Sequence, residues 1–213
     1  MLILGHTGIT LGAAVLLSGA VTGSHLLKIK QYRLEGDSPY PSQPTLTQND
    51  PPKNKASWLT SLASQVDIRL LLIGALLPDI IDKPLGLLFF RDTLSNGRII
   101  SHTLLFLILL TVAGLYLQFR HSKIWLLILS FGTLMHLILD QMWQTPKTLL
   151  WPLFGFAFER EDIIDWLPNT LQALLTKPEV YVPELVGGAI IIWFIWVVLR
   201  RRKLYSFIRY GQI

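Results

Sequence analysis

The sequence contains no cysteine, and only 15% of its residues are charged. The absence of cysteine excludes disulfides, thiolate nucleophiles and sulfur-ligated metal sites, so any metal must be held by nitrogen and oxygen ligands. An ordinary soluble domain has about a quarter of its residues charged, whereas 51% of this chain is hydrophobic and its mean hydropathy is +0.46. Because the charge deficit is concentrated in long apolar runs, the composition indicates a polytopic membrane protein.

Several catalytic motifs are also missing from the sequence. It has no Gly-x-Ser-x-Gly elbow, no His-Glu-x-x-His zinc motif and no glycine-rich loop that would cradle a phosphate. The net charge is +5, but the basic residues are spread over three segments without an aromatic stacking platform, which argues against nucleic-acid binding. We therefore expect the positive charge to set the orientation of the chain in the membrane.

Five apolar stretches are candidates for membrane-spanning helices, and we predict a single all-α integral-membrane domain over residues 1–213. A spanning helix needs about 20 residues to cross a hydrocarbon core of about 30 Å. The second stretch contains Pro78 and Pro84, which predict a kinked or partly re-entrant segment. The predicted spans are Leu2–Leu27, Ile68–Phe90, Ile99–Phe119, Ile124–Trp143 and Leu185–Leu199.

The two long connections between these spans differ in composition. Residues 28–66 form a polar, proline-rich linker, for which we expect extended or disordered chain. Residues 145–183 combine aromatic and acidic side chains, which is typical of a layer at the lipid headgroups. If the linker and the carboxyl terminus are cytoplasmic, most of the 19 Lys and Arg residues lie inside, as the positive-inside rule requires. We therefore predict a multi-pass inner-membrane protein with its amino terminus outside.

Ionisable residues lie within these apolar stretches, where each costs about 2.5–3.5 kcal/mol at the membrane centre. His136 and Asp140 are four residues apart, so on a helix their side chains share one face. Imidazole and carboxylate together suit zinc, with manganese or iron as alternatives, and we predict a site for one or more divalent metal ions. The residues that the predicted topology gathers in the outer half of the membrane are His6, Asp79, Asp82, His102, His136 and Asp140.

Other interpretations of this set of residues stay open at the level of the sequence. The set could be a hydrogen-bonded network that fixes helix packing, or a pathway by which a transporter moves protons or divalent ions. The cytoplasmic halves of the predicted spans are almost wholly apolar, which favours a one-sided site over a transport path. Arg98 and Lys83 beside the set indicate an anionic substrate, although both could be interfacial anchors that snorkel.

Three motifs, preceded by the early His6, carry a resemblance to a known family. They are Gly74-Ala75-Leu76-Leu77-Pro78-Asp79 with Asp82, Arg98-Ile99-Ile100-Ser101-His102-Thr103, and His136-Leu137-Ile138-Leu139-Asp140. They resemble motifs of the bacterial and archaeal membrane-bound metal-dependent hydrolases, which include inner-membrane hydrolases under LexA control. Gly97 stands where family members often have a histidine, so any role of that histidine is absent here.

The order of the candidate ligands is also similar to that of zinc-dependent phospholipase C and its nuclease relatives, which are helical enzymes that cleave phosphoesters. This likeness implies one metal at a set of four residues, with His6 at a second metal. The four residues are Asp79, His102, His136 and Asp140. We therefore expect a metal-dependent hydrolase that activates water.

Two further residues receive catalytic roles in this hypothesis. Asp82 is expected to position or deprotonate the attacking water, or else to be a metal ligand. Arg98 is expected to stabilise negative charge on the substrate oxygens. A site in the outer half of the bilayer is best reached by molecules already in the membrane, so we expect a phosphoester in a lipid or lipid-linked substrate.

Overall fold

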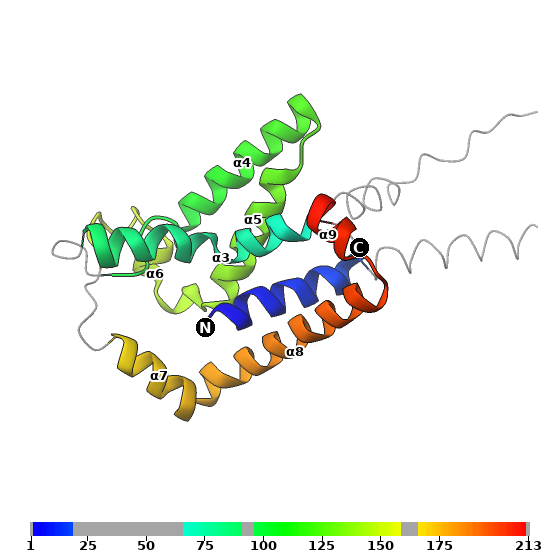
Figure 1. Cartoon of the computed structure of the whole chain (residues 1–213). Helices are drawn as coiled ribbons and strands as arrows, with labels where there is room; N and C mark the ends of the chain where they lie inside the picture. The colour runs from blue at the N-terminus through cyan, green and yellow to red at the C-terminus, as the bar shows by residue number, and fades with distance from the viewer. Residues whose placement is uncertain (1, 19–65, 91–95, 159–165, 212–213) are drawn as a thin grey trace, which may run out of the picture. The chain divides into compact units, whose positions relative to one another are not determined.

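A computed structural model describes residues 2–18, 66–90, 96–158 and 166–211, and these residues form helices and turns without any strand (Figure 1). The polar linker predicted at residues 28–66 lies almost entirely outside the described residues, as does the second part of the first predicted span. The described residues of 2–12 and 66–211 belong to one compact unit, and every contact discussed below lies within it.

The order of the helices follows the apolar stretches of the sequence. An unlabelled first helix, Ile3–Ser18, comes before the gap, and α9 ends the described chain (Figure 1). The labelled elements are α3 (Ile68–Pro84), a π-helical turn η1 (Leu85–Phe89), α4 (Leu104–His121), α5 (Trp125–Leu139), a 3-10 turn η2 (Met142–Gln144), α6 (Pro146–Leu149), α7 (Trp166–Thr176), α8 (Pro178–Arg200) and α9 (Leu204–Tyr210). The prediction of an all-helical protein is therefore confirmed for the described residues.

Two of the described helices, α4 and α8, are long and apolar enough to cross a membrane. The helix α8 contains the predicted span Leu185–Leu199 and begins seven residues earlier, at Pro178. The first helix and α5 are apolar but shorter than 18 residues. Helix length and composition thus support two spans, and the predicted count of five is not confirmed.

Pro78 lies inside α3, which is helical on both sides of it. A proline lacks an N–H, so the carbonyl of Gly74 has no intrahelical donor at position 78. The Thr133 hydroxyl of α5 lies 3.4 Å from that carbonyl, but its single proton has a closer acceptor in the carbonyl of Leu129 at 3.0 Å. Ser101 donates to the carbonyl of Pro78 at 2.9 Å. The change in helix type comes only after Pro84, where the π-helical turn begins. The helix α3 is therefore continuous through Pro78.

The helix α4 begins five residues later than predicted from the apolar run. Thr103 caps its amino end, because the hydroxyl of Thr103 accepts the N–H of Phe106 at 3.1 Å. Residues 96–103 are consequently a loop. Arg98 lies in this loop and His102 lies just before the cap, so the expectation that the helix includes His102 is wrong.

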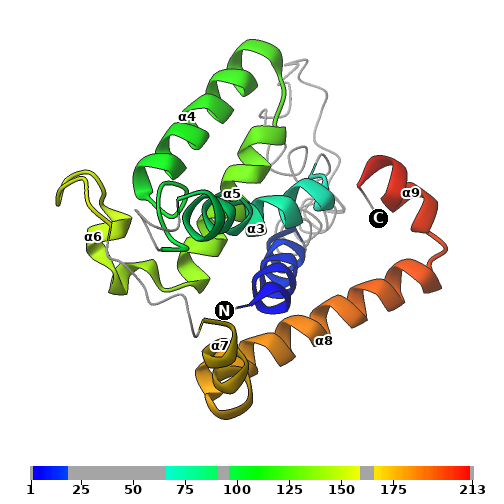
Figure 2. The ribbon, with the colours of Figure 1, turned by 60° about the vertical axis from the view of Figure 1, so that its left-hand side comes forward.

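Glycines allow close backbone contact in two helix pairs. Gly74 of α3 and Gly132 of α5 lie against each other's helices, since a Cβ on Gly132 would lie 2.6 Å from the backbone nitrogen of Ala75. Gly187 of α8 likewise lies against the first helix, and a Cβ there would lie 2.1 Å from the carbonyl oxygen of Leu4. Small residues at such contacts let helices approach closely. Figure 2 shows the crossing of α3 and α5.

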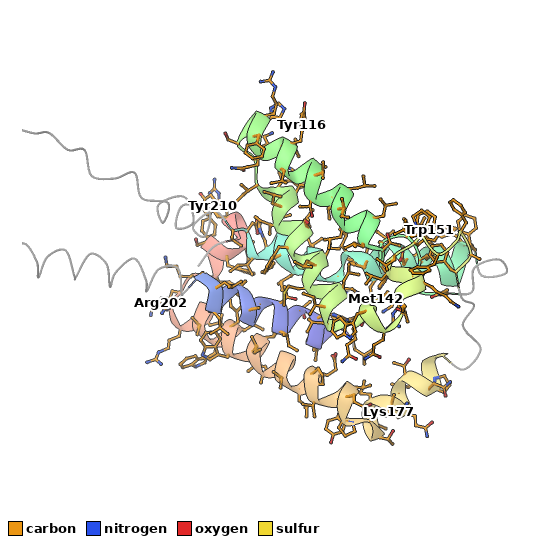
Figure 3. The ribbon with its side chains drawn as sticks, turned by 180° about the vertical axis from the view of Figure 1, so that it is seen from behind. Tyr116, Met142, Trp151, Lys177, Arg202 and Tyr210 are labelled. Carbon is orange, nitrogen blue, oxygen red and sulfur yellow. The ribbon has the colours of Figure 1, made fainter. Side chains whose placement is uncertain are left out.

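A small apolar core lies where α4, α5 and the following turn meet. Met142, labelled in Figure 3, is almost fully buried and packs with Leu107 and Leu137. Leu149 of α6 covers this cluster from the side. The core holds the carboxyl end of α5 in place, which matters because His136 and Asp140 belong to that end.

We predict that Gly187→Ala destabilises the protein by about 1–3 kcal/mol, because the new methyl group would overlap the backbone of the first helix. Gly188→Ala is the matched control, since a Cβ there meets only the end of the Leu4 side chain at 3.7 Å. The measurement is thermal unfolding of the two purified variants in detergent. Equal midpoints for both variants would contradict the close contact between α8 and the first helix.

Candidate metal centre

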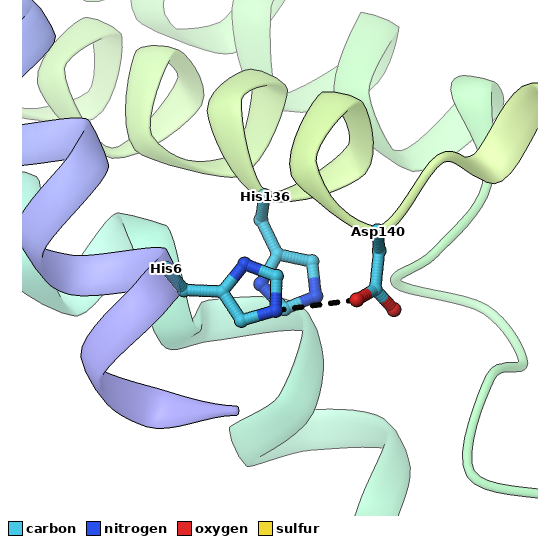
Figure 4. Close-up of side chains that lie close together, drawn as sticks. All are labelled: His6, His136 and Asp140. Carbon is cyan, nitrogen blue, oxygen red and sulfur yellow. Dashed lines mark ion pairs between the residues drawn. The ribbon is translucent and has the colours of Figure 1, made fainter. Parts of the chain in front are cut away.

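The six ionisable residues singled out in the apolar stretches come together in the structure. They are contributed by the first helix, α3, the loop before α4, and the end of α5, and the three histidines and Asp82 are fully buried. Figure 4 shows three of them, and Asp140 is the residue that ends α5. The cluster consists of His6, Asp79, Asp82, His102, His136 and Asp140.

Asp82 holds the loop before α4 against α3. Its carboxylate accepts the backbone N–H of Ile99 at 2.7 Å, that of Ser101 at 3.0 Å and that of His102 at 3.2 Å. It also faces Nδ1 of His102 at 2.8 Å. A carboxylate accepts hydrogen bonds, so in the neutral imidazole the proton is on Nδ1 and Nε2 carries a lone pair.

His136 is oriented in the same way by a backbone carbonyl. Its Nδ1 lies 2.7 Å from the carbonyl oxygen of Ala75, which can only accept, so the proton is again on Nδ1. The contact is possible because Gly74 and Gly132 bring α3 and α5 together at this level. The Nε2 atom of His136 therefore also presents a lone pair. Partners of this kind are typical of histidines that bind a metal.

These two lone pairs point into the same space. Nε2 of His136 lies 3.2 Å from Nε2 of His102, and Oδ1 of Asp79 lies 3.6 Å from the latter and 3.9 Å from the former. Two neutral imidazoles and a carboxylate in this arrangement bring three acceptors together and supply no proton between them. Two nitrogens bound to tetrahedral zinc at about 2.0–2.1 Å are about 3.3 Å apart, close to the observed separation. The donor set therefore fits a divalent cation.

His6 and Asp140 form a second group that shares His136. Nε2 of His6 lies 3.2 Å from Oδ1 of Asp140, and the His6 ring stacks on the His136 ring with centroids 4.1 Å apart (Figure 4). Among the described residues, Nδ1 of His6 has no hydrogen-bond partner. Potential ligand atoms within each group lie within 4.8 Å of one another. Asp140 thus groups with His6, whereas the resemblance implied that it would join Asp79 and His102.

Asp79 and Asp140 are each paired with a basic side chain. Asp79 directs Oδ1 toward the histidines and Oδ2 to Nζ of Lys83 at 2.7 Å. Asp140 directs Oδ1 toward His6 and Oδ2 to Arg98, whose Nε and Nη2 lie at 2.9 and 2.8 Å. The side chains of Lys83 and Arg98 are 35% and 38% exposed, unlike the buried histidines. The cluster therefore has two cations on its accessible side.

The contacts of Asp82 bear on its predicted role at the attacking water or as a metal ligand. Both of its oxygens accept hydrogen bonds from the loop, and one of them also faces His102. Asp82 is also fully buried. It is therefore a residue that orients His102, and Asp79 is the aspartate of α3 that faces the two imidazole lone pairs.

Glu184 is a residue of this region that sequence reasoning missed. It lies on α8, is 8% exposed, and accepts the N–H of Leu2 at 2.6 Å and that of Leu4 at 3.0 Å. It thus satisfies the free donors at the start of the first helix, two residues before His6. The sequence signal that could have identified Glu184 was an acidic residue next to an apolar run. Glu184 was not considered because it immediately precedes the predicted span Leu185–Leu199.

The described residues are thus helical, with two helices long and apolar enough to cross a membrane and a buried histidine–aspartate cluster. The sequence model of the YdjM inner membrane protein family matches residues 45–209. The chain belongs to this family, and it is accordingly an inner membrane protein. The match covers every residue of the cluster except His6. Searches of curated proteins and of solved structures found no match.

We predict that Glu184→Ala loosens the first helix from α8, because two partly buried N–H groups lose hydrogen bonds that stabilise the contact by about 0.5–1.5 kcal/mol each. Backbone amides of residues 2–12 should then exchange hydrogen faster than in the unmodified protein. Glu184→Gln keeps one acceptor oxygen and should have an intermediate effect. Glu179→Ala, on the exposed first turn of the same helix, is the control. Unchanged exchange in Glu184→Ala would show that this contact does not hold the helix.

Proposed function

We propose that the protein is a metal-dependent membrane hydrolase that cleaves a phosphoester in a lipid or lipid-linked substrate. The observation that carries the proposal is the 3.2 Å separation of Nε2 of His102 and Nε2 of His136, with Asp79 beside them. A bound divalent ion lowers the pKa of a coordinated water toward about 7 and polarises a phosphoryl oxygen. The residues around the site would supply the binding and orientation that such chemistry needs.

In this proposal Asp79, His102 and His136 hold one divalent ion, and zinc suits two imidazoles and a carboxylate best. Manganese or iron would accept the same ligands. Three protein ligands leave an open position, as in catalytic zinc sites. Since Nδ1 of His136 is engaged by the carbonyl of Ala75, His136 can serve only one ion. We therefore propose one tightly held ion, with His6 and Asp140 as additional ligands or close neighbours.

The positions of the two cations support an anionic substrate. Lys83 and Arg98 are partly exposed, and each contacts a carboxylate of the cluster. A phosphoryl group that approached from this side would meet both positive charges, and arginine in particular presents a planar fork that matches phosphate oxygens. Arg98 is proposed to stabilise the charge that develops on these oxygens.

The orientation of the ligands before substrate binds is a further element of the proposal. The carboxylate of Asp82 and the carbonyl of Ala75 fix the tautomers of His102 and His136. Such partners orient metal ligands and raise their basicity, and their loss weakens metal binding or activity about 10–100-fold in known sites. The chain therefore need not rearrange its imidazoles to receive the ion.

We further propose that five segments cross the membrane, with the amino terminus outside and the carboxyl terminus in the cytoplasm. The segments are the first helix, α3 with η1, α4, α5 and α8. This topology puts the cluster in the outer half of the bilayer and residues 28–66 in the cytoplasm. Leu153, Phe154 and Phe156 are strongly exposed, as expected for a segment at the headgroups. A lipid-linked substrate would reach such a site from within the membrane.

We predict about one zinc ion per chain in the purified protein. The double substitution His136→Ala and Asp140→Ala should abolish metal binding, as should His102→Ala, because each removes groups of the cluster. His121→Ala is the matched control, since His121 is exposed at the end of α4. Metal analysis of the purified variants is the measurement. A metal-free unmodified protein that resists loading with zinc would indicate a packing network instead.

We predict that the loaded protein hydrolyses at least one member of a panel of phospholipids, prenyl phosphates and simple phosphoesters, and that chelators stop the reaction. Arg98→Gln should lower kcat/KM more than it lowers metal content, because Arg98 contacts the ligand Asp140 through only one oxygen. The alternative is a transporter of protons or divalent ions. Metal-dependent ion flux into liposomes without hydrolysis would favour that alternative and overturn the enzymatic proposal.

A further inference from the structure

The chain turns sharply after α8, and basic residues gather at the turn. Arg200, Arg201, Arg202 and Lys203 are consecutive and exposed, and Arg209 is exposed on the following helix. The sequence contains no acidic residue after Glu184. We call residues 200–210 the basic elbow. Its charge is uniformly positive at the end of a 23-residue apolar helix that is long enough to cross a membrane.

The basic elbow has a defined conformation. The backbone N–H of Arg202 donates to Leu199 and that of Lys203 donates to Val198, both at 3.0 Å. Phe194 of α8 and Phe207 of α9 meet edge to face with ring centroids 5.6 Å apart. Figure 2 shows the resulting angle between α8 and α9. The turn therefore holds the two helices in one relative orientation.

The start of α3 secures the other side of α9. The carbonyl of Gly211 accepts the N–H of Ile68 at 2.9 Å, and the carbonyl of Ile208 accepts Nη1 of Arg69 at 2.7 Å. Arg69 also pairs with Asp67 at 2.6 Å, so the negative charge of Asp67 is compensated. The hydrogen bond from Arg69 keeps the pKa of Asp67 below its usual range. The positive charge of the elbow is therefore not neutralised by this nearby acid.

The outward face of α9 combines apolar, aromatic and basic side chains. Leu204, Tyr205 and Ile208 are exposed, and their spacing puts them on one face of the helix. The guanidinium of Arg209 lies over the rings of Tyr205 and Tyr210. Figure 3 labels Arg202 in the turn and Tyr210 at the end of α9. Side chains of these types are typical of a helix that lies at the level of lipid headgroups.

We propose that the basic elbow binds the anionic phospholipid headgroups of the leaflet at which α8 ends. Charge complementarity is the first argument, because clusters of four or more Lys and Arg residues beside a spanning helix bind anionic lipids. The second argument is the exposed face of α9, which would insert its apolar side chains beside the headgroups. Since α9 is bonded to the start of α3, the bound leaflet would also set the depth of α3. The proposal requires a membrane-spanning α8 and is independent of the metal site.

The absence of cysteine allows a direct test. Tyr205→Cys carries a single thiol, to which an environment-sensitive fluorophore is attached in the otherwise unmodified full chain. The labelled protein is placed in nanodiscs of phosphatidylcholine alone or of phosphatidylcholine mixed with phosphatidylglycerol. We expect a blue shift of the emission in the mixed lipid, because the label moves into the headgroup region. Free glycerol phosphate should not produce the shift in phosphatidylcholine alone.

A charge variant provides the second arm of the test. Replacement of Arg200, Arg201, Arg202 and Lys203 by glutamine should abolish the dependence on phosphatidylglycerol. Arg120→Gln with Lys123→Gln, exposed at the turn between α4 and α5, is the matched control and should keep it. Equal emission in both lipids for the labelled protein that keeps its four basic residues would overturn the proposal, whether or not the glutamine variant folds. A shift that survives loss of the four charges would overturn it as well.

Discussion

The carboxylate of Asp82 is the contact on which the cluster depends. It is fully buried and accepts hydrogen bonds from three backbone N–H groups and from the imidazole of His102. A buried carboxylate is tolerated only when such donors replace its water. By binding residues 99–102 it turns the chain back onto α3, sets the start of α4 and directs Nε2 of His102. The Asp82 side chain thus determines both the conformation of the loop before α4 and the orientation of His102 in the cluster.

The charge distribution of the cluster also follows from which hydrogen-bond partners its side chains have. Each imidazole that faces the centre already donates one proton, to Asp82 or to Ala75, so each has only a lone pair left for its neighbour. Asp79 and Asp140 divide their oxygens between the histidines and a cation. The result is an acceptor-rich interior beside two partly exposed positive charges. The buried acceptors suit a bound cation, and the partly exposed positive charges suit an anionic substrate. This arrangement is the physical basis of the proposed hydrolase.

The sequence indicated correctly that polar residues from separate apolar segments would meet, because ionisable groups in apolar helices need partners. It failed where a long-range hydrogen bond decided the outcome. The apolar run from Ile99 predicted a helix, but Asp82 binds the N–H groups of that stretch and delays α4 to Leu104. Pro78 predicted a kinked or partly re-entrant segment, and α3 is helical on both sides of that proline. Glu184 escaped notice because its partners lie 180 or more positions away.

Local pattern was sufficient to identify a helical membrane protein and the few side chains that are anomalous within its apolar segments. Periodicity and hydropathy depend on neighbouring residues, so they can be read along the chain. The direction of each lone pair, the sharing of carboxylate oxygens and the support of the first helix by α8 were decided only by tertiary structure. Apart from the local pair Asp79–Lys83, these features depend on atoms about 3 Å apart in space whose residues are 20 or more positions apart in sequence, and a hydrogen bond is sensitive to small changes in that distance.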